Sequence, residues 1–79
     1  DQHMSVSWFI RSFKQYMGIT PMQYITSIRI NKAKELLKNT NYSIQEVGSL
    51  SGYDNPLYFS RIFHKQTGCS PSQYRREQP

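Results

Sequence analysis

The strongest constraint on the fold is an internal repeat with an offset of 50 residues. Residues 5–25 and residues 55–75 align without a gap. Seven positions are identical in the two copies, namely Phe9/Phe59, Arg11/Arg61, Phe13/Phe63, Gly18/Gly68, Pro21/Pro71, Gln23/Gln73 and Tyr24/Tyr74. Because 79 residues leave no room for a longer array, two copies of one short helical unit are the simplest interpretation. A chain that presents the same helix twice is expected to bind a partner that also repeats.

The charge balance favours an anionic partner. Ten Lys and Arg against five Asp and Glu give a net charge of +5 and a pI of about 9.6, which indicates nucleic acid first and a membrane surface second. The single cysteine, Cys69, excludes an internal disulfide and predicts a reduced, intracellular protein. No apolar run approaches the roughly 18 residues that span a bilayer, and no signal peptide is recognised.

Helical spacing dominates the first copy, and no segment shows the sustained alternation of a strand. A helix is predicted to begin with Ser5 as its N-cap and to stop at Gly18. Its buried stripe is predicted to be Phe9, Phe13 and Tyr16.

The longest helix is predicted from Pro21 to about Asn39, after a Thr20 hydroxyl cap with proline at the first helical position. Ile30 falls off the line of its apolar stripe. The stripe itself is formed by Met22, Ile25, Ile28, Ala33, Leu36 and Leu37. The segment from Asn39 to Tyr42 is a polar break.

Residues 43–66 have the pattern of a helix-turn-helix. Ser43 and Glu46 form a capping box, and Gly48 allows a second helix to approach closely. The inward residues of the short first helix are predicted to be Ile44, Val47 and Leu50. After a turn at Gly52, the second helix is predicted to start at Asn55-Pro56, to bury Phe59, Ile62 and Phe63, and to end at Gly68. Ser70-Pro71 then begins one or two further helical turns, to Arg76.

Two stretches closely resemble the AraC/XylS family of bacterial transcription regulators. Ser49 to Arg75 is similar to the family signature, and Gln23 to Leu37 is similar to its linker helix. The resemblance implies an all-α, homeodomain-like tandem of two helix-turn-helix units joined by a long linker helix, each unit placing one recognition helix in the major groove. It also implies that the first unit is incomplete, because the family's first helix and the scaffold helix of that unit have no counterpart here.

On this interpretation residues 1–79 form a single DNA-binding domain. Residues 1–19 are the remnant of the first unit with its recognition helix, residues 20–39 are the linker helix, and residues 43–76 are the second unit and terminal helix. A linker of about 19 residues is roughly 29 Å long, and successive major grooves on one face of B-DNA recur every 34–36 Å or so. Two recognition helices on this spacer could reach adjacent groove segments without a dimer. The site would then be asymmetric or a direct repeat.

The residues opposite the apolar stripes are the candidates for DNA contact. A guanidinium can bond bidentately to guanine, so Arg11 and Arg61 are the first candidates for base reading, with a solvated surface role as the alternative. The full set of candidates for base contact is Ser7, Ile10, Arg11, Leu57, Ser60 and Arg61. Candidates for phosphate contact are Trp8, Lys14, Arg29, Tyr58, His64 and Lys65, with the backbone amides near Ser43 and Asn55.

Several of these residues have a second interpretation. Arg29 could instead pair with Glu35 or brace the linker helix, and Trp8 and Tyr58 are more often packing residues. Tyr24 and Tyr74 are expected to pack, each closing the end of its unit. A protein-interaction module is the alternative function; its apolar docking patch would be Ile10, Leu57 and Tyr58.

Enzyme function is not expected. Gly68 breaks the helix between His64 and Cys69, and no third group orients the histidine. His3, His64 and Cys69 do not form a metal-ligand set, so neither cofactor nor metal is predicted. The expected partner is double-stranded DNA and not a membrane, with an RNA polymerase contact left open. The resemblance implies a cytoplasmic, nucleoid-associated bacterial protein whose dimerisation, if any, uses regions outside this chain.

Overall fold

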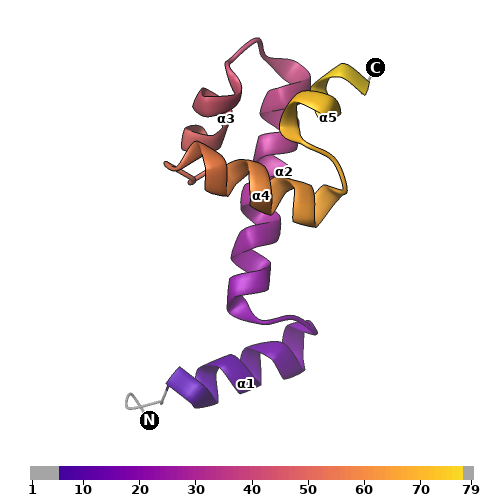
Figure 1. Ribbon diagram of the computed structural model, residues 1–79. Coiled ribbons are helices and arrows are strands. Elements are labelled where there is room, and N and C mark those ends of the chain that lie inside the picture. The colour runs from indigo at the N-terminus through magenta and orange to yellow at the C-terminus, as the bar shows by residue number, and fades with distance from the viewer. Residues whose placement is uncertain (1–5, 78–79) are drawn as a thin grey trace.

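A rod-like central helix carries one helix at its first end and three around its second half (Figure 1). The computed structural model describes residues 6–77. Within that range the all-α prediction is confirmed, and the described part of the molecule extends over 48 × 21 × 20 Å. The helices are α1 (Val6–Met17), α2 (Pro21–Asn39), α3 (Ile44–Leu50), α4 (Pro56–Thr67) and α5 (Pro71–Glu77). The Ser5 cap lies outside the described residues.

Side-chain caps set the start of each central helix. The Ser43 hydroxyl accepts from the Glu46 amide at 3.1 Å, and the Glu46 carboxylate accepts from the Ser43 amide at 2.9 Å. The predicted capping box is thus confirmed, and the hydrogen bond from the Ser43 amide is the main cause that lowers the pKa of Glu46. Thr20 and Gln23 form a second box at 3.1 and 2.9 Å. Asn55 accepts from two amides at the start of α4.

Glycine ends the first helix of each copy at the same place. Gly18 and Gly68 have φ values of 83° and 88°, a left-handed conformation that costs glycine little. The Gly18 amide donates to the Lys14 carbonyl at 2.7 Å, and the Gly68 amide donates to the His64 carbonyl at 2.8 Å. The predicted stops are confirmed.

The repeat in sequence is also a repeat of ring contacts. Ring centroids lie 5.9 Å apart for Phe9–Phe13 and 5.8 Å apart for Phe59–Phe63. The pairs Phe13–Tyr24 and Phe63–Tyr74 follow at 5.7 and 5.5 Å. Tyr24 and Tyr74 therefore close equivalent ends of the two units, as predicted.

The described core lies in the second unit, where α3, α4 and α5 surround the second half of α2. An added Cβ at Gly48 would lie 2.8 Å from the Phe59 ring, which confirms a close crossing of α3 and α4. The core side chains are Ile30, Ala33, Leu37, Val47, Tyr53, Phe59 and Phe63. Arg75 of α5 closes the C-terminal end of α2, since its guanidinium donates to the Leu37 and Thr40 carbonyls at 3.1 and 3.2 Å.

The predicted burial of the first unit is wrong for α1. Phe9 is 48% exposed and Tyr16 90% exposed, whereas Phe59 is fully buried. The physical reason is a missing cover: α3 packs on Phe59 through Gly48, and no helix of residues 6–77 occupies the equivalent place on α1.

Two further predictions of burial are corrected. Ile30 is buried, whereas the side chains of Met22, Ile25 and Ile28 are exposed. The first half of α2 packs beside α1, and its second half faces the core. A single apolar stripe therefore does not describe the whole helix. Leu50 is 57% exposed. The buried face of α3 is centred on Val47 and Gly48, and Leu50 lies beyond it.

Candidate nucleic-acid interface

The outward face of α4 carries most of the side chains predicted for DNA contact in the second unit. Burial of Phe59 and Phe63 turns the opposite side of the helix to solvent. Leu57 is 74% and Tyr58 54% exposed, and Ser60 is half-buried at the edge of the face. The exposed charged and titratable side chains there are Arg61, His64 and Lys65.

The equivalent face of α1 is also exposed. Arg11 lies one repeat before Arg61 and is exposed like it. Its predicted neighbours on α1 are likewise exposed, namely Ser7, Trp8, Ile10 and Lys14. Among residues 6–77 the ion pair is Lys32–Glu35 at 3.8 Å, so neither repeated arginine is held by a carboxylate of that part of the chain. Each guanidinium keeps its donors available for an external acceptor.

Arg29 occupies a different environment from the other phosphate candidates. Its guanidinium carbon lies 5.3 Å from the centroid of the Tyr53 ring, within the range of a cation–π contact. Its Nε would be 2.9 Å from a Cβ at Gly52, so it also lies against the turn between α3 and α4. The predicted alternative of an Arg29–Glu35 pair is wrong, since the Glu35 carboxylate pairs with Lys32. The geometry supports the bracing interpretation.

Tyr58 both packs and stays exposed. Its ring centroid lies 5.7 Å from that of Tyr53, which in turn stacks on Phe59 at 5.9 Å. About half of the Tyr58 surface nevertheless remains open to solvent. Packing was predicted as the alternative to a phosphate contact, but the ring packs on Tyr53 and about half of the residue still remains accessible.

Three of the backbone amides near Ser43 and Asn55, the predicted phosphate donors, are already bonded. The Glu46 amide donates to Ser43, and the Leu57 and Tyr58 amides donate to the Asn55 side chain. Pro56 has no N–H to offer. The caps therefore already bond the Glu46, Leu57 and Tyr58 amides.

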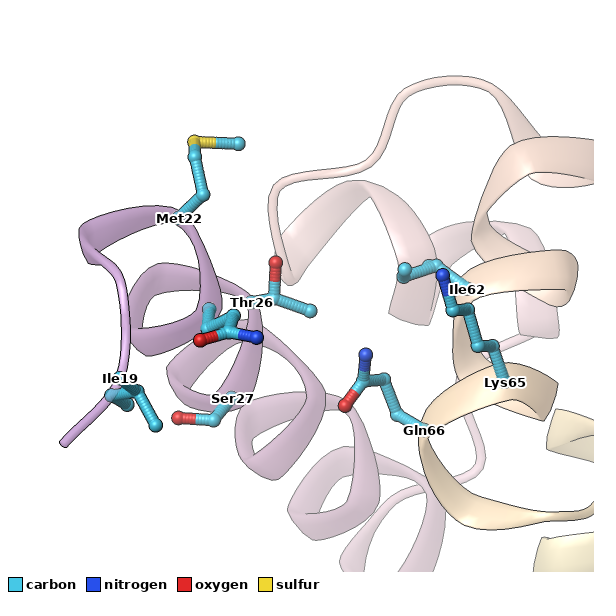
Figure 2. Close-up of a pocket in the computed structure, with 8 residues that line it drawn as sticks. Ile19, Met22, Thr26, Ser27, Ile62, Lys65 and Gln66 are labelled. Atoms are coloured by element: carbon cyan, nitrogen blue, oxygen red, sulfur yellow. The ribbon is translucent and has the colours of Figure 1, made fainter. Parts of the chain in front are cut away.

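Two hollows flank the first half of α2. One, of about 480 Å³, lies between α2 and the C-terminal half of α4 (Figure 2). The other, of about 450 Å³, lies between α1 and the start of α2, with Phe9 and Ile10 on one wall. Met22 lines both hollows. The space between the two outward faces is thus concave along α2.

The described residues contain no cluster of metal-ligating side chains. Cys69 is half-buried beside the Thr67 hydroxyl, with Sγ and Oγ1 3.8 Å apart. No group of three or more His, Cys, Asp or Glu side chains among residues 6–77 could hold a metal ion, and His3 lies outside that range. Nor does that range contain a helix with the length and apolar character needed to cross a bilayer.

A family model described as a helix-turn-helix domain matches residues 2–77. The chain belongs to the AraC-type helix-turn-helix family. Among AraC-type relatives, the arabinose operon regulatory protein of Escherichia coli is 43% identical over 72 residues, which cover 91% of this chain and 25% of that protein. The MmsAB operon regulatory protein of Pseudomonas aeruginosa is 39% identical over 74 residues, covering 94% and 24%. The chain spans about a quarter of the length of these relatives.

Solved AraC-type domains share the arrangement of helices. The C-terminal domain of AraT, a response regulator from Geobacillus stearothermophilus, superposes with a TM-score of 0.90 at 43% identity, covering 94% of this chain and 61% of that one. The DNA-binding domain of AdpA, a global transcriptional factor solved in complex with a target DNA, gives 0.86 at 34% identity, covering 94% and 67%. The tandem architecture predicted for this chain is therefore confirmed as that of AraC-type domains.

Proposed function

We propose that the chain binds double-stranded DNA sequence-specifically, as the DNA-binding part of an AraC-type transcription regulator. The observation that carries this proposal is the pair of equivalent exposed faces, on α1 and α4, at separate places along one rigid helix. The 19 residues of α2 span roughly 29 Å, close to the 34–36 Å or so between successive major grooves. The relatives are operon regulators, and one structural neighbour is a complex with DNA.

The orientation of the two helices supports a direct repeat over a palindrome. The side of α1 that faces the first half of α2 carries Ile10, and the side of α4 that faces it carries Ile62. The repeat makes Ile10 equivalent to Ser60, on the other flank of α4. Because α1 and α4 face α2 with opposite sides, the two helices are related by a translation along α2. A two-fold axis would instead make both helices face α2 with the same side. Arg11 and Arg61 would then point to one side.

In this arrangement the roles divide by position on each face. The proposed base-reading residues are Ser7, Ile10 and Arg11 on α1, and Leu57, Ser60 and Arg61 on α4. The proposed phosphate contacts are Trp8, Lys14, Tyr58, His64 and Lys65. Arg29 is reassigned from phosphate contact to bracing, on the strength of its position over Tyr53. The first unit would be completed by a helix that packs on Phe9 as α3 packs on Phe59.

Other expectations belong to the same proposal. The regulator would act in the bacterial cytoplasm, on the nucleoid, and its dimerisation and any contact with RNA polymerase would involve surfaces of the full regulator. Neither partner is needed for the DNA contact itself, because the two faces are carried by one chain.

Selection of bound sequences from a pool of random duplexes tests the proposed function. The expected result is two short blocks of preferred bases, about 10–10.5 base pairs apart and in the same orientation. Affinity should fall steeply with salt, since neutralised phosphates release counterions. The alternative of a protein-docking patch at Ile10, Leu57 and Tyr58 predicts no preferred sequence and a nearly flat salt titration.

A further inference from the structure

The hollow between α2 and α4 lies between the two outward faces. Lys65 follows Arg61 by one helical turn on α4, so the wall of the hollow continues the outward face of that helix. Ile19, on the opposite side, comes directly after the Gly18 that ends α1. Figure 2 shows Lys65 and Gln66 extending from α4, with Thr26 and Ser27 across the gap on α2.

The lining of the hollow suits a sugar–phosphate backbone. It offers one ammonium group from Lys65 together with amide and hydroxyl groups from Gln66, Gln23 and Thr26, and no lining side chain is a carboxylate. A phosphate therefore meets donors and no like charge. The apolar parts of the lining, Met22 and Ile62 among them, suit the carbon surface of deoxyribose.

Duplex geometry brings a backbone to this place. Two successive major-groove segments on one face of B-DNA are separated by a minor groove, which is bordered by the two phosphate backbones. If α1 and α4 occupy those segments, the intervening backbone must pass in front of the first half of α2. That stretch of α2 is where the surface is hollowed.

We propose that the sugar–phosphate backbone bordering the minor groove between the two major-groove segments lies across this hollow. Lys65 neutralises one of its phosphates, and Gln66 and Thr26 donate to the same strand. The inference rests on the proposed function, because it needs both recognition helices on the DNA. It adds α2 as a third contact element, between the two helices that read bases.

The test uses the full chain and a duplex recovered from random selection, with single phosphates replaced one at a time by neutral methylphosphonate. For the wild-type chain, replacement at the central minor groove should weaken binding. Lys65→Met should reduce the slope of log affinity against log salt concentration by about 0.9. The loss of affinity relative to the wild type should therefore be about eightfold larger at roughly 0.1 M salt than at roughly 1 M salt. Neutralising the phosphate opposite Lys65 should cause no further loss in that variant.

Lys38→Met is the matched control, because it removes the same charge from an exposed lysine near the far end of α2. It should leave the central phosphates as important as in the wild type. Gln66→Glu places a carboxylate in the hollow with almost no change in shape, and should weaken binding more at low salt than at high salt. Circular dichroism checks that each variant stays helical.

The outcomes separate the two proposals. Failure of the wild-type chain to select any sequence would contradict the proposed function. If selection succeeds but the central phosphates can be neutralised without loss, or Lys65→Met and Lys38→Met behave alike, the backbone site is wrong and the proposed function stands.

Discussion

At the scale of single residues, the second unit is well packed but carries one uncompensated polar group. Ser51, between α3 and the turn, is 5% exposed, and its hydroxyl has no hydrogen-bond partner in the structure. A buried hydroxyl without a partner costs stability because it has given up its bonds to water.

Ser51→Ala is therefore expected to leave the free energy of unfolding unchanged or to raise it by about 1 kcal/mol. Urea unfolding followed by circular dichroism measures the difference. Ser49→Ala, on the exposed side of α3, is the control for helix propensity. A loss of more than about 1 kcal/mol for Ser51→Ala alone would show that the hydroxyl is bonded.

Arg75 shows the opposite case, a half-buried arginine with two hydrogen bonds to backbone carbonyls. It joins α5 to the end of α2 through two carbonyls that the helix itself cannot satisfy. Arg75→Ala should lower the free energy of unfolding by about 1.5–3 kcal/mol, the usual range for hydrogen bonds to charged groups. Arg76→Ala changes an exposed neighbour and should lower the free energy of unfolding much less. Equal losses for the two variants would contradict the capping role of Arg75.

At the scale of elements, the sequence predicted what is local and missed what depends on packing between elements. The caps at Thr20, Ser43 and Asn55 follow from residue type and spacing. The close approach at Gly48 was recognisable because a small residue precedes a turn and a helix with aromatic residues. The buried face of α2 was not, because its two halves face different partners. The Arg75 cap spans 38 residues of sequence, and no local pattern signals it.

The candidate site followed the same division. The repeat located Arg11 and Arg61. The apolar stripe of α4 placed Arg61 on the exposed face, whereas the stripe predicted for α1 is itself largely exposed and does not distinguish the face of Arg11. The role of Arg29 depends on its contact with the turn after α3. The sequence of α2 alone does not predict that this turn lies beside Arg29. The hollow beside Lys65 arises only when α4 crosses α2, so its polar lining on α2 gave no signal in sequence.

The brace between α2 and the turn can be separated from a phosphate contact. Arg29→Lys keeps the charge and loses the planar group over Tyr53. It should lower stability by about 0.5–1 kcal/mol and leave the salt slope of DNA binding unchanged. Arg29→Met should lower stability further, again with the slope intact. A slope reduced by about 1 in Arg29→Met would instead assign Arg29 to a phosphate.

At the scale of the whole molecule, the two units are equal in sequence pattern but unequal in support. The second has a closed core, whereas the first shows the rings of Phe9 and Tyr16 to solvent. Both helices nevertheless join the helix that follows them through equivalent ring contacts, Phe13–Tyr24 for α1 and Phe63–Tyr74 for α4. One helical rod with two copies of the proposed DNA-contacting helix accounts for the basic charge and the repeat together.

The most direct test compares Arg11→Ala with Arg61→Ala on the selected duplex and on its single-base variants. Each substitution should weaken binding by about 1–3 kcal/mol and relax the preference in one block of bases only, a different block for each arginine. The central claim would be contradicted if both variants relaxed the same block, or if either bound with wild-type affinity and selectivity.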